Sequence, residues 1–141
     1  MLQIMDTTFD TVSGQPTFDA LLSEYADECR LKDLQEPACQ RDVYRAMEKA
    51  GIMCTMAAFN DKALIGFSTI LISVLPHYGV LMATTESAGL QLIHRAENLA
   101  IDRGAAGLLV TAPVGGTLSK VLPRLGYTDT NTVFFRRLTN E

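Results

Sequence analysis

The sequence contains few of the residues that build disulfide frameworks or metal sites. Its three cysteines, Cys29, Cys39 and Cys54, are odd in number and far apart, and no Cys-x-x-Cys pair occurs. The two histidines, His77 and His94, do not have the spacing of a metal-binding pair. We therefore expect buried or free thiols in a reducing compartment, and no bound metal.

Excess positive charge and long apolar runs are also lacking. The net charge is −4, which argues against nucleic-acid binding because that function needs a basic face to neutralise phosphates. The longest apolar stretch, residues 63–76, is interrupted by a glycine, two serines and a threonine, so no segment is expected to span a membrane. The first residues carry no basic region of a signal peptide. These features predict a cytosolic protein.

What is present is typical of an ordinary globule. The chain has 141 residues, of which 48% are hydrophobic and 20% charged, and this length is enough to bury a proper core. No internal repeat, low-complexity segment or linker interrupts it. We expect a single domain over residues 1–141.

The most informative stretch is residues 80–112, which reads as strand, turn, helix and strand. An apolar and then β-branched run ends at Thr85, and Glu86-Ser87-Ala88-Gly89 breaks it. Apolar residues then recur at helical spacing until Gly104, where a helix would stop. A strand that feeds a helix through small residues leaves backbone N–H groups free for an anion such as phosphate. Many α/β proteins, however, have such turns and bind nothing there.

The remaining elements follow from periodicity and turn residues. Asp6 to Gln15 is expected to form a loop, and Pro123 should kink or shorten the helix that contains it. Val43, Met47 and Ala50 are expected to face inward from the second helix. Strands are predicted at 2–5, 52–59, 63–75, 80–85, 108–111 and 131–138, and helices at 16–29, 37–50, 88–103 and 117–125.

This order predicts an α/β (α+β) fold with a mixed, mostly antiparallel sheet and helices on both of its faces. Three consecutive strands should be antiparallel, because short turns join them. The helix over 88–103 then crosses over, so the strand after it can lie parallel to the strand before it.

The order of elements, closed by Leu125-Gly126-Tyr127, resembles the GNAT superfamily of acyl-CoA-dependent N-acyltransferases. The middle is also similar to a subgroup common in bacteriophage genomes, with Leu75-Pro76-His77-Tyr78-Gly79 followed by a strand that ends in Glu86-Ser87. The resemblance covers about residues 52–138 and implies a GNAT-like sheet with one parallel strand pair after the central strand.

The resemblance implies transfer of an acetyl group from acetyl-CoA, the acyl donor, to a primary amine of a small molecule or protein, and a homodimer is common among similar proteins. Backbone groups of Met82, Ala83 and Thr84 would meet the pantetheine arm, although ordinary sheet pairing would use the same groups. The cofactor-binding residues that it implies in the turn and on the far side of the slot are Ser87, Ala88, Gly89, Leu90, Thr111 and Val114.

Three residues are candidates for proton transfer. Glu86 would be the general base. It could equally be an acidic side chain whose negative charge stabilises the N-terminus of the following helix. His77 is the alternative base, because histidine exchanges protons near neutral pH; it could instead be an ordinary turn residue. Ser119 is the nearest hydroxyl to Leu122, which stands where the family often has the tyrosine that protonates the leaving thiolate.

The sequence also departs from the family at the phosphate-binding turn, which is shortened between Glu86-Ser87 and Ala88-Gly89. The short turn is either a natural deletion or a segment omitted from the sequence. Three functions remain. The first is an N-acetyltransferase, and the second is a degenerate GNAT fold that acts without catalysis as a binding or structural protein, in a phage setting on the second resemblance. The third is a regulatory module that binds acyl-CoA without turnover.

Overall fold

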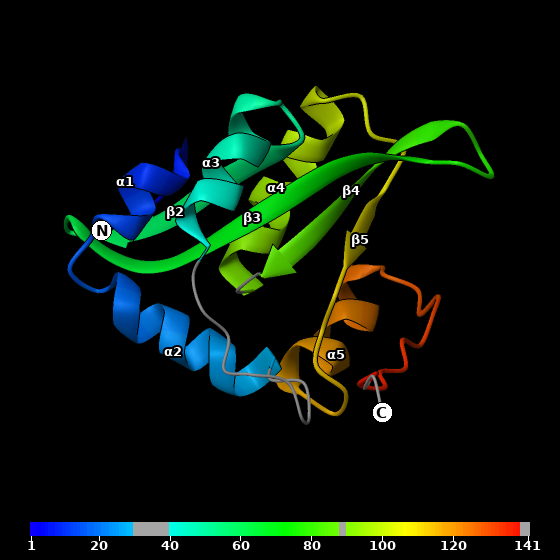
Figure 1. Cartoon of the computed structure of the whole chain (residues 1–141). Coiled ribbons are helices and arrows are strands. Elements are labelled where there is room, and N and C mark those ends of the chain that lie inside the picture. Colours follow the sequence, from blue (N-terminus) through cyan, green and yellow to red (C-terminus); the bar gives the residue numbers. More distant parts are fainter. Residues whose placement is uncertain (30–39, 88–89, 139–141) are drawn as a thin grey trace.

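The computed structural model describes residues 1–29, 40–87 and 90–138 of the chain (Figure 1). The strands are β1 Leu2–Thr7, β2 Met53–Asn60, β3 Ala63–Leu75, β4 Val80–Ser87 and β5 Leu108–Val110. The helices are α1 Phe9–Ser13, α2 Phe18–Cys29, α3 Arg41–Lys49, α4 Leu90–Asp102 and α5 Thr117–Val121, and a short 3-10 helix, η1, spans Leu122–Leu125.

The described strands form one sheet in the order β1-β2-β3-β4-β5. The first four strands are antiparallel to their neighbours, and β4 and β5 run parallel. The predicted fold class is therefore confirmed, including the parallel pair after the central strand. Helix α4 is the crossover that makes this pair possible, since parallel neighbours cannot be joined by a tight turn.

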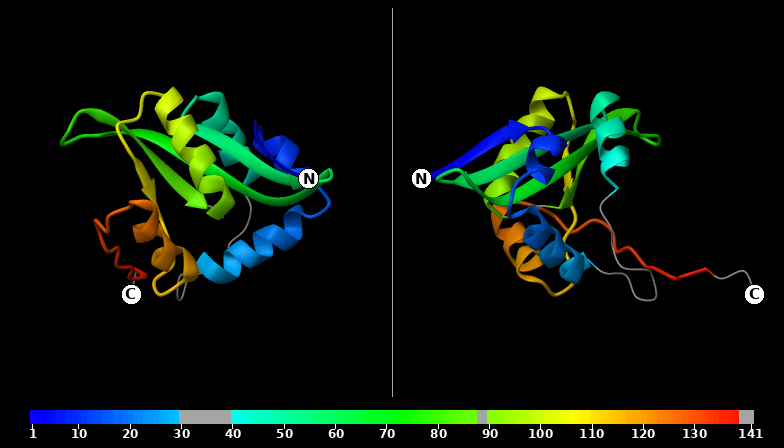
Figure 2. Two further views of the ribbon diagram at one scale, coloured as in Figure 1. Left: turned by 180° about the vertical axis from the view of Figure 1, so that it is seen from behind. Right: turned by 60° about the vertical axis from the view of Figure 1, so that its left-hand side comes forward.

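Helices cover both faces of the sheet (Figures 1 and 2). On the α4 face, Leu92 and Ala96 pack with Met56 and Ile70 of β2 and β3. Cys54 belongs to the same cluster, and burial raises the pKa of its thiol above the ordinary value. This burial agrees with the expectation at Cys54, and Cys39 lies outside the described residues.

The other face is covered by α1, α2 and α3 around an aromatic cluster. The Phe9 ring stacks on Tyr44 at 4.2 Å between centroids and meets Phe18 edge-on at 5.9 Å. Phe18 also lies against Phe67 of β3. Since aromatic rings bury large areas, this cluster anchors the N-terminal helices to the sheet.

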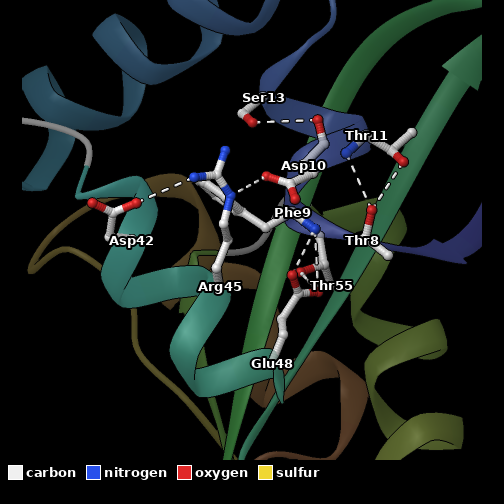
Figure 3. A network of polar contacts seen from close by, with 9 residues as sticks. All are labelled: Thr8, Phe9, Asp10, Thr11, Ser13, Asp42, Arg45, Glu48 and Thr55. Atoms are coloured by element: carbon white, nitrogen blue, oxygen red, sulfur yellow. Dashed lines mark hydrogen bonds and ion pairs between the residues drawn. The ribbon is translucent and has the colours of Figure 1, made fainter. Parts of the chain in front are cut away.

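A polar network binds α1 to α3 and β2 (Figure 3). The Glu48 carboxylate accepts the Phe9 backbone N–H, at 2.9 and 3.1 Å to its two oxygens, and the Thr55 hydroxyl at 3.0 Å. Arg45 of the same helix donates to Asp10 at 2.6 Å. The carboxylate thus satisfies a donor in the first turn of α1, a position where negative charge also complements the helix dipole.

Three sequence predictions are wrong. Residues 6–15 are not all loop, because β1 reaches Thr7 and α1 follows, capped by the Thr8 side chain. Of the residues expected to face inward from the second helix, Met47 packs against the core, whereas Val43 and Ala50 are exposed. The strand expected at 131–138 does not form, because this segment, which is described in full, is irregular and exposed throughout.

The short last helix is confirmed. Pro123 lies at the start of η1, where its missing N–H costs no hydrogen bond, and α5 ends just before it. Gly126 ends η1 with a φ of 92°, in the left-handed region that glycine occupies without strain. No helix in the described ranges is long and apolar enough to cross a membrane.

Replacing Phe134 by alanine is expected to change the free energy of unfolding by less than about 0.5 kcal/mol, because the side chain is 90% exposed. The matched control is Phe18→Ala, at a ring that is 1% exposed, and this change is expected to cost about 3–5 kcal/mol. Urea unfolding of both variants measures the difference. If Phe134→Ala lowered the free energy of unfolding by about 2 kcal/mol or more, the ring would have to be buried against the rest of the domain, since only a buried side chain contributes that much.

Candidate active site

The candidate site lies where β4 and β5 part. Their parallel register aligns Ala83 with Leu108 and Thr85 with Val110, and the pairing ends there. Beyond it, β4 continues for two residues to Ser87, while the chain leaves β5 toward α5. Parallel strands that separate at their carboxyl ends leave backbone polar groups without a neighbouring strand, and ligands of open α/β sheets bind at such places.

Two threonines join the strands at this last position. The Thr111 backbone N–H donates to Thr85 Oγ1 at 3.3 Å, and Thr111 Oγ1 donates to the Thr85 carbonyl oxygen at 3.1 Å. We call these residues the threonine pair. The family resemblance implies that Thr111 lines the cofactor slot, and the sequence predicts Thr85 only as part of a strand. Nothing in the sequence indicates that positions 26 residues apart exchange hydrogen bonds.

A β-bulge on β4 lies directly beside the threonine pair. Thr69 of β3 aligns with Ser87 and Ile70 aligns with Thr85, so Glu86 is the extra residue on β4. Bulges bend a strand and are frequent next to active sites. The backbone at the predicted general base therefore departs from regular sheet geometry.

The other predicted residues of β4 lie in its paired part. Ala83 donates its N–H to the Gly107 carbonyl oxygen at 3.1 Å, and Thr84 aligns with Leu109. Met82 aligns with Ser73 of β3. The backbone N–H of Ala83 is thus engaged by Gly107, directly before β5, and the part of β4 that is not aligned with β5 begins at Glu86.

The predicted anion-binding turn is only partly described. Ser87 is the last residue of β4 and Leu90 is the first of α4, whereas Ala88 and Gly89 lie outside the described residues. The order of strand β4 and then helix α4 agrees with the sequence prediction. The binding of a phosphate there stays a prediction.

His77 is not near the other candidates. It lies exposed in the turn between β3 and β4, at the end of β4 opposite to Glu86. Six strand residues at about 3.3 Å each separate Val80 from Glu86, which gives roughly 20 Å. The structure therefore separates the two alternative bases.

The remaining candidates follow β5. Val114 is 97% exposed, and the Ser119 hydroxyl of α5 donates to the Gly116 carbonyl oxygen at 2.7 Å. Leu122, at the position of the family's tyrosine, is buried. Figure 1 shows α5 beyond the carboxyl ends of β4 and β5, near the end of α2.

A pocket of about 290 Å³ lies elsewhere, at the start of β5. Its walls include Leu108, Leu125, Glu97 and Tyr127. The pKa of the Tyr127 phenol is raised, mainly because the side chain is partly buried and to a smaller extent because the Glu97 carboxylate is close to it. Because the pocket lies at the amino end of β5, it is not part of the site where the strands part. Among the described residues, no cluster of three metal-binding side chains occurs.

Comparisons with known proteins give the fold. No family model and no curated protein matches the sequence. The chain is similar in structure to a ribosomal-protein-alanine N-acetyltransferase from Brucella melitensis, with 16% identity, 99% of each chain covered and a TM-score of 0.70. It is also similar to a metagenomic aminoglycoside acetyltransferase solved with sisomicin, with 13% identity, 98% of this chain and 97% of that chain covered and a TM-score of 0.68.

A third solved structure carries a different name. The transcriptional regulator from Bacillus halodurans is 15% identical, covers 98% of this chain and 100% of its own, and has a TM-score of 0.70. Acetyltransferases therefore share this fold, as the sequence resemblance implied. At these identities the likeness establishes the fold, and the reaction must be argued from the site.

Proposed function

We propose that this protein transfers an acetyl group from acetyl-CoA to a primary amine, at the carboxyl ends of β4 and β5. The observation that carries the proposal is the combination, at one place, of a parallel pair that parts after Thr85 and Val110 with a bulge at Glu86. Solved acetyltransferases with the same fold support it.

The reaction needs three things from the site. The amine nitrogen attacks the thioester carbonyl carbon, so a C–N bond forms and the C–S bond breaks. A backbone N–H near the bulge can polarise the thioester carbonyl and stabilise the negative charge that develops on its oxygen. A base must take the proton of the amine, and the thiolate leaves as CoA after protonation.

Glu86 is the base that we assign. It follows the last paired residue of β4, at the bulge, whereas His77 lies at the other end of the strand. Ser119 is the hydroxyl nearest in the chain to the position of the family's tyrosine, and it would serve as the acid only by giving up its hydrogen bond to Gly116. Protonation of the thiolate by water is the simpler route.

The donor would lie between the end of β4 and the segment 111–114, with its pyrophosphate on the N–H groups of Ser87, Ala88, Gly89 and Leu90. The acceptor is an amine. Proteins of the same fold are named for acceptors as different as a ribosomal-protein alanine and an aminoglycoside, so the fold leaves the choice between a protein and a small molecule open to experiment.

The first test is thermal unfolding with millimolar acetyl-CoA. A ligand at about 100 times its Kd stabilises the folded state by about 2.7 kcal/mol, which raises the Tm of a domain of this size by several degrees. The control is ADP with sodium acetate, which supplies the charges without the thioester. An unchanged Tm with acetyl-CoA would contradict the proposal.

A second candidate is a protein that binds acyl-CoA or a partner without catalysis. The buried Leu122 and the engaged Ser119 hydroxyl favour it, because neither can readily protonate a thiolate. The two functions differ in one measurement. A thermal shift by acetyl-CoA without CoA release in the presence of a panel of polyamines, aminoglycosides and peptide amines supports the non-catalytic function.

A further inference from the structure

We propose that Thr85 and Thr111 are positioning residues that fix the point where β4 and β5 part, and so keep the end of β4 open for the acyl donor. The inference rests on the proposed function. It names a role for two residues that no comparison assigns.

The hydrogen-bond pattern of the strands supports this role. The Ala83 N–H donates to the Gly107 carbonyl oxygen, and bonds of a parallel ladder recur every second residue along each strand. A continued ladder would therefore place the Thr111 N–H on the Thr85 carbonyl. Instead, the N–H meets the Thr85 hydroxyl, and the Thr111 hydroxyl meets that carbonyl.

The threonine pair thus replaces one direct backbone bond by two bonds that each include a side chain. A side chain between two backbones requires more space than a direct N–H···O=C bond, so the strands begin to separate while their polar groups remain satisfied. The hydrogen bonds of Thr85 and Thr111 therefore determine where β4 and β5 separate, and the separation is not a result of fraying at the strand ends.

Burial shows why the hydroxyl groups matter. Thr85 is 1% exposed whereas Thr111 is exposed, so the pair joins a buried residue of β4 to a surface residue after β5. No buried side-chain oxygen or nitrogen lacks a partner in the described part of the chain. Valine has nearly the same shape as threonine but cannot form either bond. A valine at either position would leave a polar backbone group near the site without its partner, and the strands would shift to satisfy it.

The residues after the pair are those that the proposed function needs. Glu86 is at the bulge and Ser87 ends β4, immediately beyond the last position aligned with β5. A shift of the strand ends would move the proposed base and the groups that hold the donor. The threonine pair therefore acts through its neighbours and does not need to touch the donor.

The experiment compares donor affinity in three variants by isothermal titration with acetyl-CoA. Thr111→Val should raise the Kd about fivefold to tenfold, the value expected for one lost hydrogen bond. Thr111→Ser keeps the hydroxyl and should bind within twofold of the wild type. The matched control is Thr55→Val, which removes a comparable bond from a buried threonine, 3.0 Å from Glu48 and on another strand.

Each outcome decides one question. A raised Kd for Thr111→Val, with normal Kd values for Thr111→Ser and Thr55→Val, supports the positioning role, because a general loss of stability would affect Thr55→Val equally. Wild-type affinity in Thr111→Val overturns the inference and leaves the proposed function standing. No binding by the wild-type protein overturns both.

Discussion

Replacement of Glu86 by glutamine is expected to lower kcat about 10²-fold or more, while acetyl-CoA still binds. Glutamine has almost the same shape as glutamate but cannot accept a proton from the attacking amine. Since the change acts on proton transfer and not on the donor site, the Kd for acetyl-CoA should stay within about twofold, which separates lost chemistry from lost binding. CoA release with a thiol reagent measures the rate, and titration calorimetry measures the Kd.

Two variants make this result specific. His77→Ala tests the alternative base and should leave kcat unchanged, since the turn after β3 lies at the far end of β4. Glu97→Gln removes a carboxylate of α4 that lines the separate pocket, and it serves as the matched control for charge. Unchanged turnover in Glu86→Gln would remove Glu86 from the mechanism, and a loss in His77→Ala instead would assign the base to that turn.

The sequence was most informative where local pattern and tertiary structure agree. The run from β3 through β4 and α4 to β5 has β-branched strands, turn residues at each break and a helix with one apolar face. In the structure, Leu92 and Ala96 from that face are buried against the sheet. Each element has its own signal, and the crossover by α4 then determines the parallel pair.

One helix was missed and one strand was predicted wrongly, because the signal of the first is short and the formation of the second depends on a partner strand. Helix α1 has five residues, too few for a clear periodic pattern, although Thr8 as a cap and the spacing of Phe9 and Val12 were visible. Residues 131–138 have the composition of a strand, but a strand forms only when another strand pairs with it. No strand of the described sheet pairs with residues 131–138, so their β-branched and aromatic side chains lie in solvent.

The sequence predicts where the candidate site lies in the chain, but it does not predict the geometry of that candidate site. Residues 80–112 contain the motif, and their order predicted where two strands would end together. The bulge at Glu86 depends on the register with β3, and the threonine pair depends on contacts between positions far apart in the chain. Such features follow from packing and leave no local pattern.

The largest stability effect of a polar residue is expected at Glu48. Glu48→Ala should lower the free energy of unfolding by about 2–3 kcal/mol and the Tm by roughly 10 °C, because hydrogen bonds to a charged group are stronger than neutral ones. The carboxylate binds the Phe9 N–H and the Thr55 hydroxyl at once. Without it, the first turn of α1 loses its partner, and the aromatic cluster around Phe9 loses its support.

Two comparisons separate the carboxylate from the rest of the network in Figure 3. Glu48→Gln retains one oxygen acceptor and should fall between the wild type and Glu48→Ala. Arg45→Ala removes the exposed ion pair with Asp10, and it should change the Tm far less, since water screens exposed pairs. Equal effects of Glu48→Ala and Arg45→Ala would mean that surface charge, and not the buried donors of α1 and β2, accounts for the contribution of Glu48.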